Sequence, residues 1–124
     1  MTQMKADLSI TDEFMRQKLT VAKDYSLMIL RVGVKWHQPG RDHIIWEHGR
    51  RNFQLREEKL ISIICPVIDG SQVKGICIFN ADTEETKRLM NDDPGVKAGV
   101  FTYEVHPCRG FPGDSLAGGN QIST

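Results

Sequence analysis

The chain has 124 residues, no formal net charge at pH 7, and 40% apolar and 26% charged residues. This length suits a single domain, and the composition argues against a disordered or fibrous protein. The balanced charge argues against nucleic-acid binding, and the longest apolar run is too short to span a membrane, so neither partner is expected.

The first segment of the chain, residues 1–24, is an N-terminal extension in our interpretation. Within it, residues 11–19 predict a short helix with Thr11 as its N-cap. An extended segment that packs on a neighbouring chain is the alternative. Residues 25–34 then predict a strand, and four consecutive apolar residues at 27–30 give this strand two apolar faces.

Residues 41–58 show the longest helical pattern, which follows Pro39-Gly40 and takes Asp42 as its predicted N-cap. At about 100° per residue, apolar residues gather on one arc of this helix and charged residues on the other. The apolar arc contains a histidine, which we therefore expect to point toward the core. The members of this arc are Ile44, Ile45, Trp46, His48, Gly49, Asn52, Phe53 and Leu55.

Two further strands are predicted at residues 60–67 and 73–79, and they are joined by a hairpin turn at Asp69-Gly70. Both strands also carry apolar residues on both of their faces, so neither strand has a face that is suited to solvent. This pattern is typical of a sheet that is covered on both faces.

The last part of the chain predicts a helix over residues 83–91, with Asp82 as its N-cap and Glu85 in the capping-box position. Asp93-Pro94-Gly95 ends this helix, and residues 100–105 predict the last strand. From residue 108 to 124 we expect a mobile tail, or one that embraces a partner, because the segment is rich in Gly, Ser and Pro from residue 110 onward.

The order of these elements is βαββαβ over residues 25–107, which predicts an α+β domain of the ferredoxin-like type with both helices on one face of an antiparallel sheet. Two helices cover only one face, yet the strands are apolar on both. We therefore expect a second copy of the chain to cover the other face, which gives a symmetric homodimer. Leaving a few hundred Å² of such surface wet would cost several kcal/mol at about 25 cal/mol per Å².

His48 and Asp93 are the candidate catalytic residues. A neutral imidazole on an inward helix face can exchange protons near pH 7. His48 lies about 10 Å along its helix and Asp93 about 15 Å along the other, at about 1.5 Å per residue, so the two can reach a similar level. Glu58 is the rival partner of His48. The alternative is a core histidine that is paired with a backbone carbonyl, with Asp93 as a turn former.

A substrate pocket near His48 is expected to include Trp36, His37, Ile45 and Asn52. Trp36, together with Trp46, offers an aromatic wall for a planar ligand, although packing in the core is the ordinary role of tryptophan. His37 and His43 flank the Pro-Gly loop, where they either line the mouth of a pocket or face solvent.

No phosphate-binding loop, dinucleotide fingerprint, nucleophile elbow or zinc-protease motif occurs in the sequence. His106-Pro107-Cys108 has no second pair at ligand spacing, so we expect no metal site. The three cysteines, Cys65, Cys77 and Cys108, are odd in number and widely spaced, which is typical of reduced thiols in the cytoplasm. No apolar leader segment follows Met1, so no secretory signal is expected.

Two segments resemble the YciI-like (YCII-related) family. His48-Gly-Arg-Arg-Asn-Phe-Gln-Leu-Arg-Glu-Glu-Lys-Leu60 is similar to its histidine-led helix, and Asp93-Pro-Gly-Val-Lys-Ala-Gly99 is similar to its Asp-Pro-x-x-x-Ala-Gly motif. Cys65 precedes Pro66 where that family usually has glycine. The resemblance covers about residues 25–107 and implies a dimeric α+β barrel in which His48 and Asp93 form the active-site pair.

These residues and this resemblance lead us to expect a small cofactor-free enzyme of the isomerase or lyase type. His48 would shuttle a proton on a small apolar or aromatic substrate, and Asp93 would orient the ring and stabilise the imidazolium. A non-catalytic dimer that binds a small molecule or a partner protein is the first alternative. A cofactor-independent monooxygenase of the same fold is the second, because fold does not fix function.

Overall fold

The computed structural model describes residues 9–118 of the chain. Asp24–Arg109 forms the larger of two compact units, and the segments outside it form the smaller one. The elements in chain order are α1 (Asp12–Thr20), β1 (Lys23–Val32), α2 (Arg41–Glu57), β2 (Ile61–Pro66), β3 (Val73–Phe79), α3 (Thr83–Asn91), α4 (Pro94–Lys97) and β4 (Phe101–Gly110).

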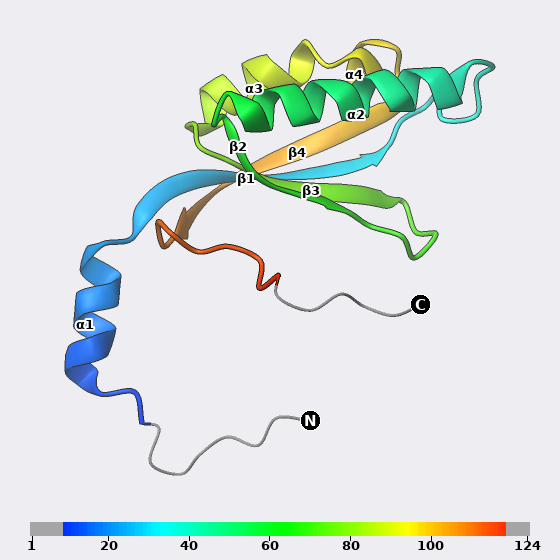
Figure 1. The fold of residues 1–124 in the computed structure, drawn as a ribbon. Coiled ribbons are helices and arrows are strands. Elements are labelled where there is room, and N and C mark those ends of the chain that lie inside the picture. The colour runs from blue at the N-terminus through cyan, green and yellow to red at the C-terminus, as the bar shows by residue number, and fades with distance from the viewer. Residues whose placement is uncertain (1–8, 119–124) are drawn as a thin grey trace. The chain divides into compact units, whose positions relative to one another are not determined.

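The four strands form one antiparallel sheet in the order β2-β3-β1-β4. Helices α2, α3 and α4 lie together on one face of this sheet (Figure 1). The predicted α+β class is confirmed, and the topology is compatible with the ferredoxin-like plan. Met28 of β1 and Ile64 of β2 both pair with Cys77 of β3, so these three residues share one face of the sheet.

The core of the larger unit lies between the sheet and its helices. Buried apolar side chains from all four strands meet those of α2, of α3 and of the residue before β4 there. The buried apolar residues are Met28, Leu30, Leu55, Ile61, Cys77, Phe79, Leu89, Met90, Val100 and Phe101.

Helix α1 belongs to the smaller unit and is capped as predicted. Thr11 Oγ1 accepts a hydrogen bond from the N–H of Phe14 at 3.1 Å. None of the residues of α1 is buried. Residues 1–8 of the expected N-terminal extension and residues 119–124 of the expected tail lie outside the described part of the chain.

The N-terminus of α2 differs from the prediction that Asp42 caps it. Gly40 is the N-cap residue, with a left-handed φ of 82°, and it makes no side-chain hydrogen bond. A left-handed turn is open to glycine because it has no Cβ. Asp42 instead lies in the first turn, where a carboxylate interacts favourably with the positive end of the helix dipole.

The outer surface of α2 is more apolar than the helical pattern predicts. Trp46 and Phe53 fall on the predicted inward arc, yet their exposed fractions are 68% and 52%. The buried stripe of α2 is limited to His48, Asn52 and Leu55. One helix face meets the sheet along a narrow line, so residues at the edges of a wide apolar arc stay outside it.

Two further differences concern the end of the domain. A short helix, α4, follows Asp93 where the sequence predicts only a helix stop. Strand β4 continues to Gly110, five residues beyond its predicted end at residue 105. None of the helices within residues 9–118 is long and apolar enough to cross a bilayer.

Candidate active site

His48 and Asp93 meet in the core of the larger unit. His48 Nδ1 lies 2.8 Å from Asp93 Oδ1, and the exposed fractions of the two residues are 7% and 0%. His48 comes from the middle of α2, and Asp93 comes from the junction between α3 and α4. The pairing expected from their levels along the two helices is therefore present in the structure.

The position of Asp93 is fixed by the helix that it caps. Its Oδ2 accepts hydrogen bonds from the backbone N–H groups of Gly95 at 2.9 Å and Val96 at 3.2 Å. These N–H groups belong to the first turn of α4 and have no partner within the helix. Proline follows Asp93 at the first helical position, where its missing N–H is not needed.

This environment determines which ring nitrogen of His48 carries a hydrogen. Backbone N–H groups can only donate, so Asp93 acts as an acceptor, and Arg51 Nη1 adds a positive charge 3.9 Å from its Oδ1. Nδ1 of His48 is therefore the donor to Asp93. In the neutral ring, Nε2 is then left with a lone pair.

Asn52 lies next to that lone pair, one helical turn beyond His48. Its Nδ2 is 3.2 Å from His48 Nε2, and its side chain is buried. The other amide atom, Oδ1, is buried and has no hydrogen-bond partner among the described residues. A buried polar atom without a partner costs about 1–3 kcal/mol, so this acceptor is suited to a ligand that brings a donor.

The ring of Phe101 packs against the imidazole ring of His48. The two ring centroids are 4.7 Å apart at an interplanar angle of 54°. The ring of Phe101 reaches this place because residue 95 is glycine, since a Cβ at Gly95 would overlap that ring. Gly99, which ends the same segment, has a left-handed φ of 77°. The Asp-Pro-Gly-Val-Lys-Ala-Gly segment is therefore a short helix closed by a glycine turn, and it presents Asp93 to His48.

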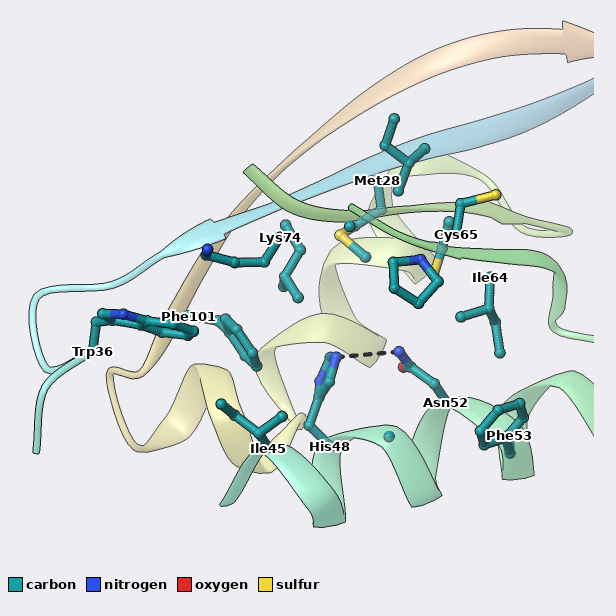
Figure 2. Close-up of a pocket in the computed structure, with 16 residues that line it drawn as sticks. Met28, Trp36, Ile45, His48, Asn52, Phe53, Ile64, Cys65, Lys74 and Phe101 are labelled. Atoms are coloured by element: carbon teal, nitrogen blue, oxygen red, sulfur yellow. Dashed lines mark hydrogen bonds between the residues drawn. The ribbon is translucent and has the colours of Figure 1, made fainter. Parts of the chain in front are cut away.

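A cavity of about 280 Å³ opens beside His48 and Asn52, between α2 and the sheet (Figure 2). A cavity of about 150 Å³ already takes benzene, so this one has room for a single ring with substituents. Its walls are mainly apolar and aromatic. They are formed by Met28, Leu30, Trp36, Ile45, His48, Gly49, Asn52, Phe53, Ile64, Cys65, Pro66, Lys74, Gly75, Ile76, Cys77 and Phe101.

The thiol of Cys77 in the wall of this cavity is held in its neutral form. Burial, more than any neighbouring charge, raises the pKa of Cys77 from 9.0 to about 12. A thiol acts as a nucleophile only as the thiolate, so Cys77 contributes an apolar surface rather than a reactive group near neutral pH.

Of the pocket residues predicted from the sequence, the structure brings Trp36, Ile45 and Asn52 together around the cavity. His37 lies elsewhere, in a shallow hollow formed by the loop before α2. Glu58, the rival partner of His48, follows the last turn of α2, and its Oε2 accepts a hydrogen bond from Gln54 Nε2 at 2.7 Å.

Sequence reasoning did not single out Phe101, Lys74 or Arg51 as part of this site. Phe101 stands in a strand pattern that gives no hint of its contact with a histidine. Arg51 is the neighbour of Arg50 in a charged stretch that predicts a solvated face, yet its Nη1 is buried. The glycine two residues after Asp93 is the one local signal, because such a glycine permits a close contact.

No protein-family model matches the chain, and a comparison with curated proteins finds no match. The resemblance to the YciI-like family therefore depends on the two segments quoted above. Among residues 9–118, no three His, Cys, Asp or Glu side chains gather as metal ligands would.

Proposed function

We propose that the chain is a small cofactor-free enzyme in which His48 transfers a proton to and from a small apolar or aromatic substrate. The observation that supports this proposal is the buried chain Asp93–His48–Asn52 at the wall of an apolar cavity. A histidine that is merely satisfied in a core needs no cavity at its second nitrogen. The pairing with a carboxylate at Nδ1 is the arrangement that makes Nε2 a useful general base.

The reaction type follows from what these side chains can do. His48 Nε2 takes a proton from an acidic C–H or O–H of the substrate, and Asp93 stabilises the imidazolium that forms. The proton then returns to a different atom of the substrate, which is an isomerisation, or it stays on the ring while a leaving group departs with its electron pair, which is an elimination. Neither path requires an oxidant or a reductant.

Asn52 adapts to the two protonation states of His48. In the neutral ring its Nδ2 donates to Nε2, whereas the protonated ring becomes a donor at Nε2. Rotation of the amide by half a turn then presents Oδ1 as the acceptor. This side chain is therefore a positioning residue for the base.

A turnover assay with His48→Ala tests the proposal. Lactones, hydroxyquinones and related ring compounds with acidic C–H groups are screened by proton exchange in deuterated water and by ultraviolet absorbance. We expect a loss of about 10²–10⁴-fold in kcat with the substrate that is found, as for removal of a general base. His43→Ala is the matched control, because His43 is an exposed residue of the same helix.

Unchanged turnover in His48→Ala would contradict the proposed role. If no compound of the panel turns over while several bind in the cavity, the binding-module alternative is supported. Oxygen consumption without added cofactor would instead indicate a monooxygenase.

We also infer that the chain is a YciI-like protein that forms a homodimer through the free face of its sheet. The residues on this face alternate with the buried ones, and all of them are partly exposed. Within Asp24–Arg109 the helices lie on the opposite face (Figure 1). The three free cysteines favour the cytoplasm as its location. The apolar residues of the free face are Leu27, Ile29, Ile63, Ile76 and Ile78.

Sedimentation of Ile78→Lys tests the dimer, because Ile78 pairs with both Leu27 and Ile63 on the free face and does not line the cavity. The wild-type chain is expected to sediment as a dimer, and a lysine in the centre of the free face is expected to give a folded monomer. Ile68→Lys is the control, because Ile68 is 94% exposed in the hairpin between β2 and β3. A wild-type chain that stays monomeric at high concentration would overturn this inference.

A further inference from the structure

One extra residue interrupts the pairing of β1 with β3 beside the cavity. Leu30 pairs with Gly75, but the next residue, Arg31, pairs with Val73, so Lys74 has no partner of its own on β1. This arrangement is a β-bulge, which changes the direction of a side chain and is common next to active sites. Strict alternation from Gly75 would turn Lys74 toward the free face of the sheet.

The bulge instead places Lys74 at the cavity. Its Nζ lies 5.0 Å from the centroid of Trp36, and both residues line the cavity. Figure 2 shows the amino group of Lys74 beside the Trp36 ring, with Phe101 between Trp36 and His48. The lysine and the histidine are thus at separate places on the wall of one cavity.

Lys74 is also the one lysine or arginine of that wall, which contains no aspartate or glutamate. The ion pairs formed within residues 9–118 do not include Lys74. The pKa of Asp69 is lowered chiefly by hydrogen bonds from Ser71, with the charge of Lys74 as a minor contribution. Lys74, a partly buried residue, therefore has no carboxylate partner within residues 9–118.

We propose that the ligand of this cavity is a planar, single-ring anion whose carboxylate or enolate group binds Lys74. The ring lies among Trp36, Phe101 and His48, and a hydroxyl or N–H group of the ligand donates to the unpartnered Oδ1 of Asn52. The negative group on Lys74 holds the opposite part of the ring toward His48 Nε2. This inference extends the proposed function, because it names the substrate class for the same site.

Binding of salicylate and salicylamide to the wild-type protein tests this proposal. The two compounds share ring and hydroxyl, and only salicylate carries a negative charge. Affinity is measured by calorimetry, and the ring nitrogen signals of His48 are followed by NMR to place the ligand in the cavity. We expect salicylate to bind about tenfold to a hundredfold more tightly, as for one hydrogen bond to a charged group.

Three variants separate the charge of Lys74 from its other contacts. Lys74→Met keeps the length of the side chain and should abolish the preference for salicylate, whereas Lys74→Arg should retain it. Lys87→Met is the control, because Lys87 is exposed on α3. Thermal unfolding of each variant shows that it is folded.

Equal affinity for the two compounds, or a preference that survives in Lys74→Met, would overturn the proposal. Failure of both compounds to bind the wild type, or binding without any change at His48, would also count against it. None of these measurements needs turnover, so they are distinguishable from the test of the proposed function. His48→Gln should lose turnover and still prefer salicylate.

Discussion

Gly95 and Phe101 are in such close contact that no side chain larger than hydrogen fits at position 95. This contact places the ring of Phe101 against His48, while the N–H of Gly95 holds Asp93. The positions of Phe101 and Asp93 in the candidate site therefore both depend on the absence of a Cβ at residue 95.

Gly95→Ala is accordingly expected to destabilise the protein by about 1–3 kcal/mol, the usual cost of overpacking a core. The matched variant is Gly49→Ala, because a Cβ at Gly49 meets no atom within 4 Å. Gly49 lies inside α2, so alanine there should stabilise the protein by about 0.5–1 kcal/mol. Urea unfolding measures both changes. Equal effects of the two substitutions would show that the contact is not tight.

Asp93 has a structural role and a proposed chemical role, and two substitutions separate them. Asp93→Ala removes the cap of α4 and should cost about 0.5–2 kcal/mol in the free energy of unfolding. Asp93→Asn retains an oxygen acceptor for the cap, and asparagine caps helices as well as aspartate does.

The charge beside His48 is nevertheless lost in Asp93→Asn. We expect a folded protein in which His48 no longer keeps its hydrogen on Nδ1 alone, and ¹⁵N NMR of the ring detects the second tautomer. Turnover should fall although stability does not. An unchanged tautomer would show that Asp93 does not orient the ring.

The raised pKa of Cys77 predicts that the protein loses stability in alkali. The unfolded thiol ionises near its ordinary pKa of 9.0, whereas burial raises the pKa of the folded group to about 12. Between these values the unfolded chain binds fewer protons than the folded one, so the free energy of unfolding falls as the pH rises. The decrease is at most about 1.4 kcal/mol per pH unit.

Cys77→Ala removes part of a buried side chain, so it should be less stable than the wild type at neutral pH. Its free energy of unfolding should nevertheless fall less steeply as the pH rises in alkali. Urea unfolding of both proteins at pH values between 9.0 and about 12 provides the comparison, since the other titrating groups are common to both. Parallel curves would contradict the prediction.

Glu104 of β4 is the acceptor of a small polar cluster formed with Arg31 of β1 and His106 of β4. His106 Nε2 and Arg31 Nε each lie 2.7 Å from one of its oxygens, and they lower its pKa below 4.5, with His106 as the larger cause. The stabilisation by this cluster is present above pH 4.5 and is lost as the pH falls through the lowered value. His106→Ala should raise the pKa of Glu104 more than Arg31→Gln does. Carboxyl ¹³C titration measures this, and the reverse order would contradict it.

Local patterns predicted the elements that depend on local chemistry. The strand over residues 73–79 and the helix over residues 83–91 have the expected bounds, and Asp82 Oδ1 accepts from the N–H of Glu85 as an N-cap should. The level of His48 and Asp93 along their helices could also be estimated, because the rise per residue of a helix is constant.

The features that local patterns could not give depend on contacts between distant segments. The direction of the Lys74 side chain follows from a bulge, and the bulge is determined by the register in which β1 and β3 pair. The exposure of Trp46 depends on how wide a stripe of α2 the sheet can cover, which periodicity alone does not define. Helix α4 is too short for a periodic signal and depends on the carboxylate of Asp93.

His48 and Asp93 come from opposite sides of the hairpin that joins β2 to β3, 45 positions apart in the chain. Neither half of the domain contains both residues of the proposed proton relay. A chain that has folded only β1, α2 and β2 lacks this pair, because the pair can form only after a long loop has closed. Proton chemistry at this site would thus report on completion of the whole domain, and a protein nicked at Asp69-Gly70 would regain it only if its two pieces reassemble.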